Sequence, residues 1–507
     1  MSDWNAGYVV DLEYTVSFYR ELTPAILQTG LLAAGATLHT RINSYCELGC
    51  GHGLSMNILA AANPDIDFYA TDFNPAQIAN AKKLSSDAGL GNVHFFDQSF
   101  ADFILEPTLP DKFDVIALHG IYSWVNPEIR KQVVDFLDKK LRPGGLVYVS
   151  YNTLPGWSAA LGLRHLMYLH GKETGGPSLN RVKPALDLMT RMVELKAGYF
   201  RSSPALGGLA EMLQTQNKNY LAHEYFNDAW TAFYHNDVVN ELRPARLSFI
   251  GPSHFLDHVE ILNTTKEQRA LMAQHADATF REVLKDFMTN QPFRKDLFGR
   301  GTLHLSKAEI KERWLAQRFV LSTPSDNVPM KVKTPLGEAG LHEEAYRPIL
   351  EAFAKGVRPL NEVLGEDAIV KLGGEKMMQA LMVLLGANHL QPALEAKGEA
   401  DRRRTTRAFN LAVAQHVRHA NDISFMASPV TGGGHPVTRF DQLFLLMEWQ
   451  KSKDPVGDIW KLMSLTGEQL LQDGVPLVEE AANRARLVGL QQEFIAKRPI
   501  LVNLGIA

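Results

Sequence analysis

The stretch Glu47-Leu48-Gly49-Cys50-Gly51-His52-Gly53 decides how the first third of the chain folds. It follows a strand-like run at 42–46 and precedes a helix-like run at 54–62. Glycines let the backbone turn sharply and let a ligand approach the main chain. The unpaired amides and the positive dipole end of the new helix favour an anionic group. A strand, a glycine turn and a helix therefore predict a ligand site, and two classes of ligand compete for it.

The spacing of the glycines separates these two classes. A dinucleotide fold favours G-x-G-x-x-G, whereas this turn has glycines at 49, 51 and 53 and an acid two residues before the first of them. With Glu47 ahead of it, the loop resembles motif I of class I S-adenosylmethionine (SAM) dependent methyltransferases. In that family the glycines face the methionine part of the cofactor. The resemblance implies that SAM is the cofactor and that it contacts Glu47, Gly49, Gly51 and Gly53.

The next two strands add cofactor residues. A strand at 66–71 ends at Asp72, 21 residues after Gly51, where an acidic side chain can accept both ribose hydroxyls. A strand at 93–96 is followed by Asp97 and Gln98, and in the family an acid or amide at this point reads the adenine. We therefore assign Asp72, Phe73, Asp97 and Gln98 to the cofactor site.

A fourth strand at 113–118 and a fifth at 146–151 continue the alternation, with helices at 76–88 and 127–141 between the strands. Successive β-α repeats predict an α/β fold with a Rossmann-like parallel sheet. A nicotinamide or flavin enzyme is disfavoured by the glycine spacing. A degenerate shell that binds nothing is disfavoured because the glycines and Asp72 are present.

Composition limits the class of protein. The 507 residues exceed one core and suggest about three domains, and 45% hydrophobic with 21% charged residues is typical of a globular protein. The sequence lacks an apolar run near 18 residues and a signal peptide, so we expect a cytoplasmic protein without a membrane span. A net charge of −4 disfavours nucleic-acid binding, and we interpret the basic cluster at 401–407 as a solvated loop. The two cysteines, Cys46 and Cys50, exclude a disulfide framework, and no metal site is expected.

Polar and aromatic side chains follow strands four and five. These are His119-Gly120-Ile121-Tyr122-Ser123-Trp124-Val125 and Tyr151-Asn152-Thr153-Leu154-Pro155-Gly156-Trp157. Ligands of open α/β sheets bind at the carboxyl ends of the strands. We therefore nominate a channel for the methyl acceptor, with His119 as proton acceptor near its usual pKa of about 6.5. Its members are His119, Tyr122, Trp124, Tyr151 and Asn152.

These two stretches, with those at 220–226 and 292–298, resemble bacterial methyltransferases that carry a methyltransferase regulatory domain. Members include protein-lysine methyltransferases that modify an outer-membrane protein in some intracellular bacteria. The resemblance covers about 8–300 and implies methyl transfer from SAM to a protein lysine (EC 2.1.1.-). The Asn-Pro-Pro-Tyr mark of enzymes that methylate nucleic-acid amino groups is absent. Two alternatives stay open: a small-molecule methyltransferase whose added domains oligomerise, and a SAM-sensing regulator that reads DNA.

The expected domains follow from these patterns. They are a helical lead-in at 1–40, a SAM-binding domain at 41–170, a helical insertion at 171–215, the regulatory domain at 216–300 and a mostly helical, winged-helix-like domain at 301–507. Tyr14, Phe18 and Tyr19 of the lead-in are expected to close over the cofactor. A strand at 246–250 should pair with one at 295–298 as the antiparallel hairpin that ends the sheet. The partners we expect are a protein substrate and a second copy of the chain, not membrane or nucleic acid.

Overall fold

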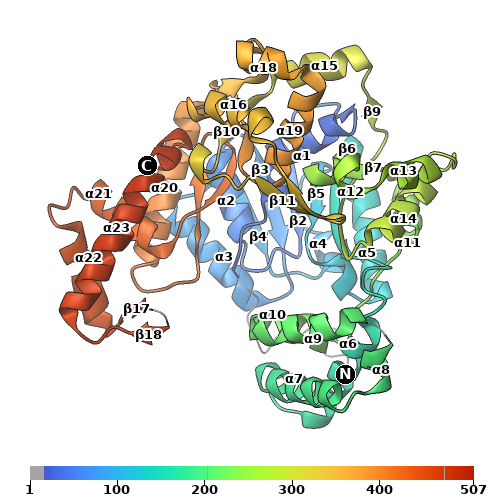
Figure 1. Cartoon of the computed structure of the whole chain (residues 1–507), viewed down its shortest axis with the longest axis horizontal. Helices are drawn as coiled ribbons and strands as arrows, with labels where there is room; N and C mark the ends of the chain where they lie inside the picture. The colour runs from blue at the N-terminus through green and yellow to red at the C-terminus, as the bar shows by residue number, and fades with distance from the viewer. Residues whose placement is uncertain (1–15, 203, 473) are drawn as a thin grey trace.

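The computed structural model describes residues 16–202, 204–472 and 474–507, and a seven-stranded sheet lies at its centre (Figure 1). The strand order is β4-β3-β2-β5-β6-β8-β7. Strands β2 to β6 pair in parallel, and β8 runs antiparallel to both β6 and β7. Their bounds are β2 Ser44–Leu48, β3 Asp67–Thr71, β4 Val93–Phe96, β5 Phe113–Leu118, β6 Leu141–Asn152, β7 Ser248–Pro252 and β8 Phe293–Gly299. The predicted Rossmann-like sheet is confirmed.

The antiparallel end of the sheet is also as predicted. Ser248 pairs with Gly299 and Phe249 with Phe298, so β7 and β8 form the expected hairpin against β6. The fifth strand is longer than the expected 146–151, because Leu141 already pairs with Phe113 and residues 142–145 lie within β6. An irregularity between Phe113 and Val115 takes up the extra residues.

The parallel strands are connected by α2 Leu54–Ala62, α3 Pro75–Asp87, the short α4 Phe100–Phe103 and α5 Pro127–Lys140. Every residue of α2 is buried. The cause is tertiary, because β15 Phe425–Ser428, β16 Gly433–Pro436 and α20 Glu399–His416 of the C-terminal region pack on its outer face. A helix that is apolar all round is expected between two layers.

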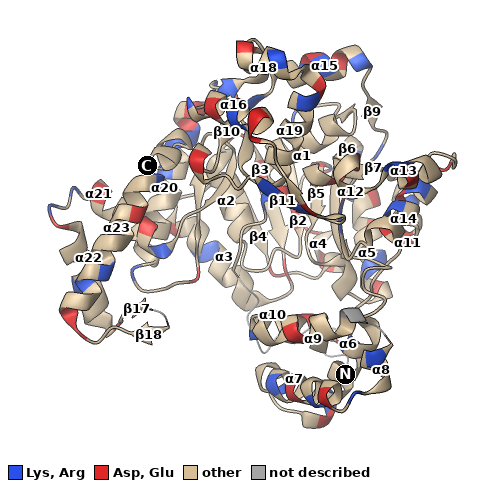
Figure 2. Cartoon of the chain, viewed as in Figure 1, with Lys and Arg blue, Asp and Glu red and all other residues tan. Residues whose placement is uncertain are grey.

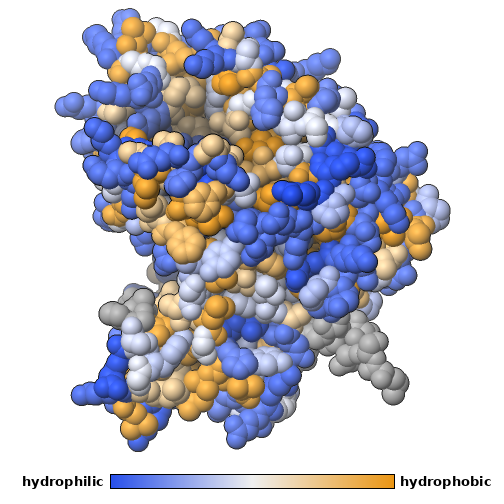
Figure 3. Space-filling view, turned by 90° about the vertical axis from the view of Figure 1, so that its right-hand side faces the viewer, coloured by the Kyte–Doolittle hydropathy of each residue, from blue (hydrophilic) through white to orange (hydrophobic). Residues whose placement is uncertain are grey.

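A separate lobe hangs below the carboxyl edge of the sheet in Figure 1. It consists of α6 Leu161–Thr174, α7 Ser178–Glu194, α8 Gly198–Arg201, α9 Pro204–Thr215 and α10 Lys218–Phe226, and it has an apolar core of its own. In the view turned by 90°, a narrow constriction separates the lobe from the rest of the molecule, and apolar residues lie among the hydrophilic ones on its surface (Figure 3).

The regulatory segment contains α11 His235–Leu242. Residues 227–234 before it cross back to the sheet, where Phe233 bridges Thr153. The helices α12 Glu260–Asn263, α13 Lys266–Met272 and α14 Ala278–Thr289 follow, and Asp277 caps the start of α14.

The C-terminal region starts with α15 Lys307–Ala316, the strand β10 Arg318–Leu321 and the hairpin β11 Lys331–Thr334 with β12 Gly337–Gly340. The strand β14 Leu390–Ala393 pairs with β10, in a three-stranded sheet with β13 Arg358–Pro359. The strands β15 and β16 form a separate hairpin. The winged-helix likeness stays a prediction, and its helices are α16 Glu343–Ala354, α17 Leu360–Leu364, α18 Asp367–Leu372 and α19 Gly374–Gly386.

The basic cluster at 401–407 is not a loop but part of α20. Arg402 is buried and donates to the carbonyls of Glu395, Lys397 and Pro429, so it closes a turn. Lys and Arg are interspersed with Asp and Glu over the elements that face the viewer in Figure 2. The remaining helices are α21 Arg439–Trp449, α22 Pro455–Thr466 and α23 Glu480–Asn503. None of the helices in the described ranges is long and apolar enough to cross a membrane.

Candidate active site

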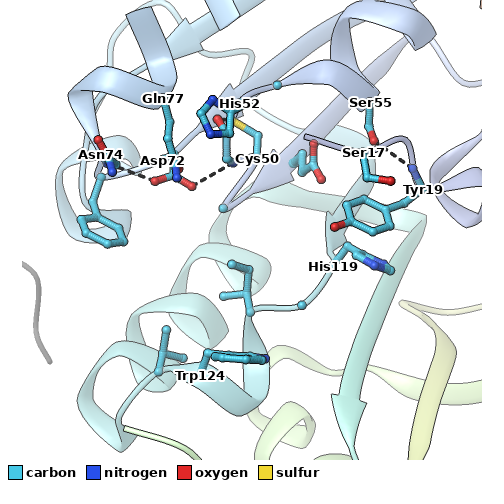
Figure 4. Close-up of a pocket in the computed structure, with 18 of the residues that line it drawn as sticks. Ser17, Tyr19, Cys50, His52, Ser55, Asp72, Asn74, Gln77, His119 and Trp124 are labelled. Atoms are coloured by element: carbon cyan, nitrogen blue, oxygen red, sulfur yellow. Dashed lines mark hydrogen bonds between the residues drawn. The ribbon is translucent and has the colours of Figure 1, made fainter. Parts of the chain in front are cut away.

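A cavity of about 530 Å³ lies at the carboxyl ends of the parallel strands (Figure 4). Its wall takes residues from the ends of β2, β3, β5 and β6, from the lead-in, from α10 and from the start of β8. In Figure 4, Asp72, Asn74 and Gln77 lie on one side, and Tyr19 and His119 on another. The volume is in the range of small-molecule and cofactor sites.

The glycine loop forms the wall beside β2. Gly49, Gly51 and Gly53 all have φ between +54° and +77°, a range that side chains rarely adopt. Two of these positions are also tightly packed. A Cβ on Gly49 would lie 2.2 Å from the Ile121 side chain, and one on Gly53 would lie 2.6 Å from the Phe95 ring. These close contacts explain why the loop uses glycine.

Asp72 holds the loop in place. Its Oδ2 accepts a hydrogen bond of 2.9 Å from the Gly51 amide, and its Oδ1 accepts one of 3.0 Å from the Asn74 amide (Figure 4). Burial raises the pKa of this carboxyl, and the bonds from the amides oppose that effect. Asp72 lines the cavity, so one carboxylate both fixes the glycine turn and faces the ligand space.

Glu47 is the last residue but one of β2, directly before the glycine turn, and lines the cavity. Only 3% of the residue is exposed, and its Oε2 has no hydrogen-bond partner among the described residues. Burial, with a smaller contribution from Asp72, raises the pKa of Glu47 to about 8. A buried carboxyl oxygen without a partner is costly unless a ligand supplies a donor. The ammonium of the methionine part of SAM is such a donor.

Of the two residues predicted to contact the adenine, only Gln98 lies in the cavity wall. Gln98 lines the cavity and donates through Nε2 to Glu106 at 3.0 Å, while its buried Oε1 lacks a hydrogen-bond partner within the described part of the chain. That oxygen can accept from an adenine amino group. Asp97 is exposed and is not part of the wall, because successive side chains of an extended segment point to opposite sides. Phe73 does line the cavity, and Tyr14 lies outside the described residues.

The lead-in reaches the cavity with one of its two described aromatics. The Tyr19 ring stacks on His119 with 3.9 Å between ring centroids, and its backbone amide donates to Ser55 Oγ at 3.1 Å. Phe18 instead packs against Phe425 and the backbone of Gly434 in the C-terminal hairpin. Phe18 therefore ties the lead-in to the C-terminal region and does not cover the site.

His119 lines the cavity, but its acidity differs from the prediction. The ring is in hydrogen-bond contact with the Tyr148 hydroxyl, 2.9 Å from Nδ1. Burial lowers the pKa of His119 to about 4, against the opposing charge of Glu21. The imidazole is neutral at pH 7 and is a weaker base than an exposed histidine, so its predicted role as the proton acceptor loses its basis.

The other four nominated acceptor-channel residues separate into two pairs. Trp124 and Asn152 line the cavity, and Asn152 Nδ2 is buried with no hydrogen-bond partner among described residues. Tyr122 and Tyr151 are not in the wall. Both rings lie in the core below, where Tyr122 donates to Glu241 at 2.6 Å and Tyr151 to Asp296 at 2.6 Å.

The Tyr151 hydroxyl belongs to a buried charge network. Arg294 donates to Asp296 at 2.8 Å, to Asp286 at 2.6 Å and to Glu282 at 2.8 Å. Burial would raise the pKa of Asp296, but Arg294 and His235 together outweigh burial and lower that pKa to about 2. The network joins β6, β8 and α14, so the structure places the Tyr151 hydroxyl in the core and not in the cavity wall.

Sequence reasoning missed the part of the wall that comes from distant segments. Trp157, Tyr220, Glu224 and Phe293 all line the cavity. Each lies in a stretch that carries the family resemblance, and that is the only signal for them in a single sequence. Their meeting depends on α10 folding back over the strand ends, which no local pattern predicts.

The polar groups and the shape of the wall fit SAM. Glu47 and Gln98 each present an oxygen without a partner among the described residues, and they would hold the methionine ammonium and the adenine, respectively. Asp72 faces the same space and would hold the ribose, while the glycine loop leaves the main chain accessible.

Comparisons with known proteins agree with this geometry. Residues 46–147 match the family described as "Methyltransferase domain", and 217–300 match "Predicted methyltransferase regulatory domain". The "Uncharacterized protein sll1526" of Synechocystis is 41% identical over 508 residues, which cover 99% of this chain and 100% of the relative. The "Uncharacterized protein RP028" of Rickettsia prowazekii is 30% identical over 201 residues, 38% of this chain and 77% of the relative.

Among solved structures, PKMT2 from Rickettsia typhi in complex with AdoHcy has a TM-score of 0.71 and 20% sequence identity. The match covers 97% of this chain and 100% of that protein. The likeness therefore extends over the whole fold, including the lobe and the C-terminal region.

Proposed function

The chain belongs to the class I SAM-dependent methyltransferases that carry a methyltransferase regulatory domain, and we propose that its methyl acceptor is a lysine amine of a protein. The name PKMT2 of the similar Rickettsia typhi structure agrees with the protein-lysine methyltransferases that the sequence resembles, which supports the proposal. The relatives from Synechocystis and Rickettsia prowazekii carry no named substrate.

The charge of the cavity wall is the observation that carries the proposal. Three carboxyls, Glu47, Asp72 and Glu224, line it, and none of the described lining residues is a Lys or Arg. Such a wall favours cationic ligands, because a bound cation stabilises the ionised form of these carboxyls, whereas a bound anion has no opposite charge to meet. SAM itself is a cation, and a lysine ammonium is another. A carboxylate or phosphate acceptor would lack a cationic partner here.

The chemistry demands a neutral amine. SAM supplies a methyl group on a sulfonium, and the acceptor must present a lone pair in line with it. A lysine with a pKa of about 10.4 loses its proton at a cost of roughly 4.6 kcal/mol at pH 7. Trp124, Trp157 and Phe293 contribute apolar rings to the wall. These rings exclude water and disfavour the charged form, so part of the cost is met by the site.

The elements beyond the sheet suit a macromolecular substrate. We propose that the insertion at 171–215 and the region at 301–507 position a protein beside the cavity and do not touch the methyl group. The lobe also exposes apolar side chains, which suit the contact of a homodimer. They are Leu161, Leu169, Leu179, Val193, Leu195 and Met212.

The test uses SAM with a labelled methyl group, the full chain and a cell lysate. We expect label in protein, recovered as methyl-lysine after acid hydrolysis. A matched lysate whose amines are acetylated beforehand should take up almost none. Label in small molecules would favour the small-molecule enzyme, and SAM binding without any transfer would favour the sensing regulator. Either result would refute the proposal.

A further inference from the structure

Glu224 is an acid in the cavity wall that comes from outside the methyltransferase sheet. It lies on α10, which belongs to the helical lobe, and it lines the same cavity as Glu47 and Asp72. Only 7% of the residue is exposed. Its Oε2 has no hydrogen-bond partner within the described ranges. A buried carboxyl with an unsatisfied oxygen facing a cavity indicates a missing donor.

The fold holds this acid firmly in place. Arg164 of α6 is buried and donates to the Glu224 carbonyl at 3.1 Å and to the Asn227 carbonyl at 2.8 Å. Its guanidinium also lies 4.5 Å from the centroid of the Trp230 ring. These bonds fall on the last turn of α10, where carbonyls lack helical partners. Arg164 thus fixes the helix end that carries Glu224 and uses its donors on the backbone.

Aromatic groups surround the carboxyl. Tyr220 lies one turn before Glu224 on α10 and lines the cavity, and Trp157 lines it as well. Trp157 packs edge-on against Trp230, with 4.7 Å between ring centroids. The Trp230 N–H and the Tyr220 hydroxyl face the carboxyl without reaching hydrogen-bond geometry on Oε2. A carboxylate among rings is a suitable site for an alkylammonium ion.

The acidity of Glu224 suits proton transfer near neutral pH. Burial raises the pKa of its carboxyl to about 7, opposed by Trp230, by the charge of Arg164 and by Tyr220. No other charged group is among the influences on it. The carboxyl is therefore partly ionised at pH 7, as an efficient general base should be. With a pKa of about 4, His119 is a far weaker base.

We propose that Glu224, with Tyr220 and Trp157, binds the ammonium of the acceptor and takes its proton, so that the helical lobe supplies the base for the transfer. This inference rests on the proposed amine acceptor. It adds a catalytic residue to the reaction and gives the lobe a chemical role besides its role in docking.

The step balances as follows. One N–H bond of the acceptor ammonium breaks, and its proton goes to the Glu224 carboxylate. The nitrogen lone pair then forms the new N–C bond as the S–C bond breaks, and that electron pair stays on sulfur. The positive charge passes from sulfur to the methylated nitrogen. Glu224 returns its proton to solvent before the next cycle.

The test compares two probes on the full chain in the presence of S-adenosylhomocysteine. One is N-acetyl-lysine N-methylamide, and the other is the norleucine analogue, which lacks the amine. Calorimetry at pH 7.5 should show that the wild type prefers the lysine probe by roughly tenfold or more, the usual value of a charged hydrogen bond. Glu224→Gln should abolish that preference and leave SAM affinity within about threefold. The exposed Glu211→Gln on α9 is the matched control and should behave like the wild type.

Kinetics give a second measurement. Glu224→Gln should lower kcat and move its pH dependence to higher pH, and Glu224→Asp should restore part of the rate. The wild type gives a measurement that does not depend on this variant: its preference for the lysine probe should fall between pH 7.5 and pH 5.5, because the Glu224 carboxyl is protonated over that range. A folded Glu224→Gln protein that keeps the preference, or a wild type that methylates protein yet shows none, would overturn the inference and leave the proposed function standing. A wild type that prefers the lysine probe but transfers no label to protein in the lysate would overturn the proposed function instead.

Discussion

Replacement of Glu47 by glutamine should uncouple SAM binding from proton release. In the unliganded protein burial raises the pKa of Glu47 to about 8, so about nine-tenths of the molecules carry a neutral carboxyl at pH 7. An ammonium placed against Oε2 favours the ionised form and lowers that pKa. Binding at pH 7 should therefore release about 0.9 proton.

The same numbers set the pH dependence of affinity. The ionised fraction of Glu47 rises about ninefold between pH 6 and pH 7, so SAM affinity of the wild type should rise by about that factor. In Glu47→Gln it should change little over this range. The wild type spends about 1.4 kcal/mol on ionising Glu47 at pH 7, while a charged hydrogen bond contributes about 1.5–3 kcal/mol. The variant should thus bind at most about fifteenfold more weakly at pH 7.

Calorimetry in buffers of different ionisation enthalpy measures the released protons directly. Asp67→Asn is the matched control, because it removes an exposed carboxyl from the first residue of β3, at the end of the strand away from the cavity. A raised carboxyl pKa also means that stability is lost as pH rises from the unfolded value of about 4.5 to about 8. Without SAM, Glu47→Gln should therefore melt at a higher temperature than the wild type at pH 8. If the wild type and Glu47→Gln release the same number of protons on binding SAM, the assignment of Glu47 to the cofactor ammonium is refuted.

Three further predictions test the correction of the site. Asp72→Ala should weaken SAM binding by about 1.5–3 kcal/mol in calorimetry, because the glycine loop loses its anchor and the ribose loses its acceptor. Asp97→Asn should bind SAM as the wild type does, and equal losses in both variants would contradict the placement of Asp72 in the cavity wall and Asp97 outside it. Tyr151→Phe should lower the free energy of unfolding by about 1–3 kcal/mol with kcat nearly unchanged, since its hydroxyl serves the buried Asp296; a large fall in kcat without a fall in stability would return it to the catalytic set. Arg294→Met should cost about 3–5 kcal/mol in denaturant unfolding because it leaves buried carboxylates unpaired, and a stable variant would show that they are neutral in the native protein.

The sequence predicts the sheet and the cofactor side of the site because those signals are local. Each parallel strand is a short apolar run that ends in its own loop, so its carboxyl end can be found without knowing its neighbours. Glu47, Asp72 and Gln98 follow directly from such ends and line the cavity. The hairpin of β7 and β8 was predictable from the resemblance to the family, because an antiparallel hairpin ends the class I methyltransferase sheet.

Neighbouring positions already exceed what periodicity can decide. Tyr151 and Asn152 are adjacent at the end of one strand, yet Asn152 faces the cavity and Tyr151 the core. Asp97 and Gln98 separate likewise. A strand alternates between two faces, and only the packed structure shows which face meets the ligand. The acidity of His119 also depends on burial that a sequence does not state.

The part of the acceptor side that comes from distant segments was decided by tertiary structure. Trp157, Glu224 and Phe293 are separated by 67 and 69 residues, and they meet because α10 folds back over the strand ends while β8 returns beside β6. Local propensity records how each segment prefers to fold but not which distant segment it will contact. The sequence therefore determined the cofactor and the class of reaction, and the long-range packing of the lobe on the sheet determined which side chains meet the methyl acceptor.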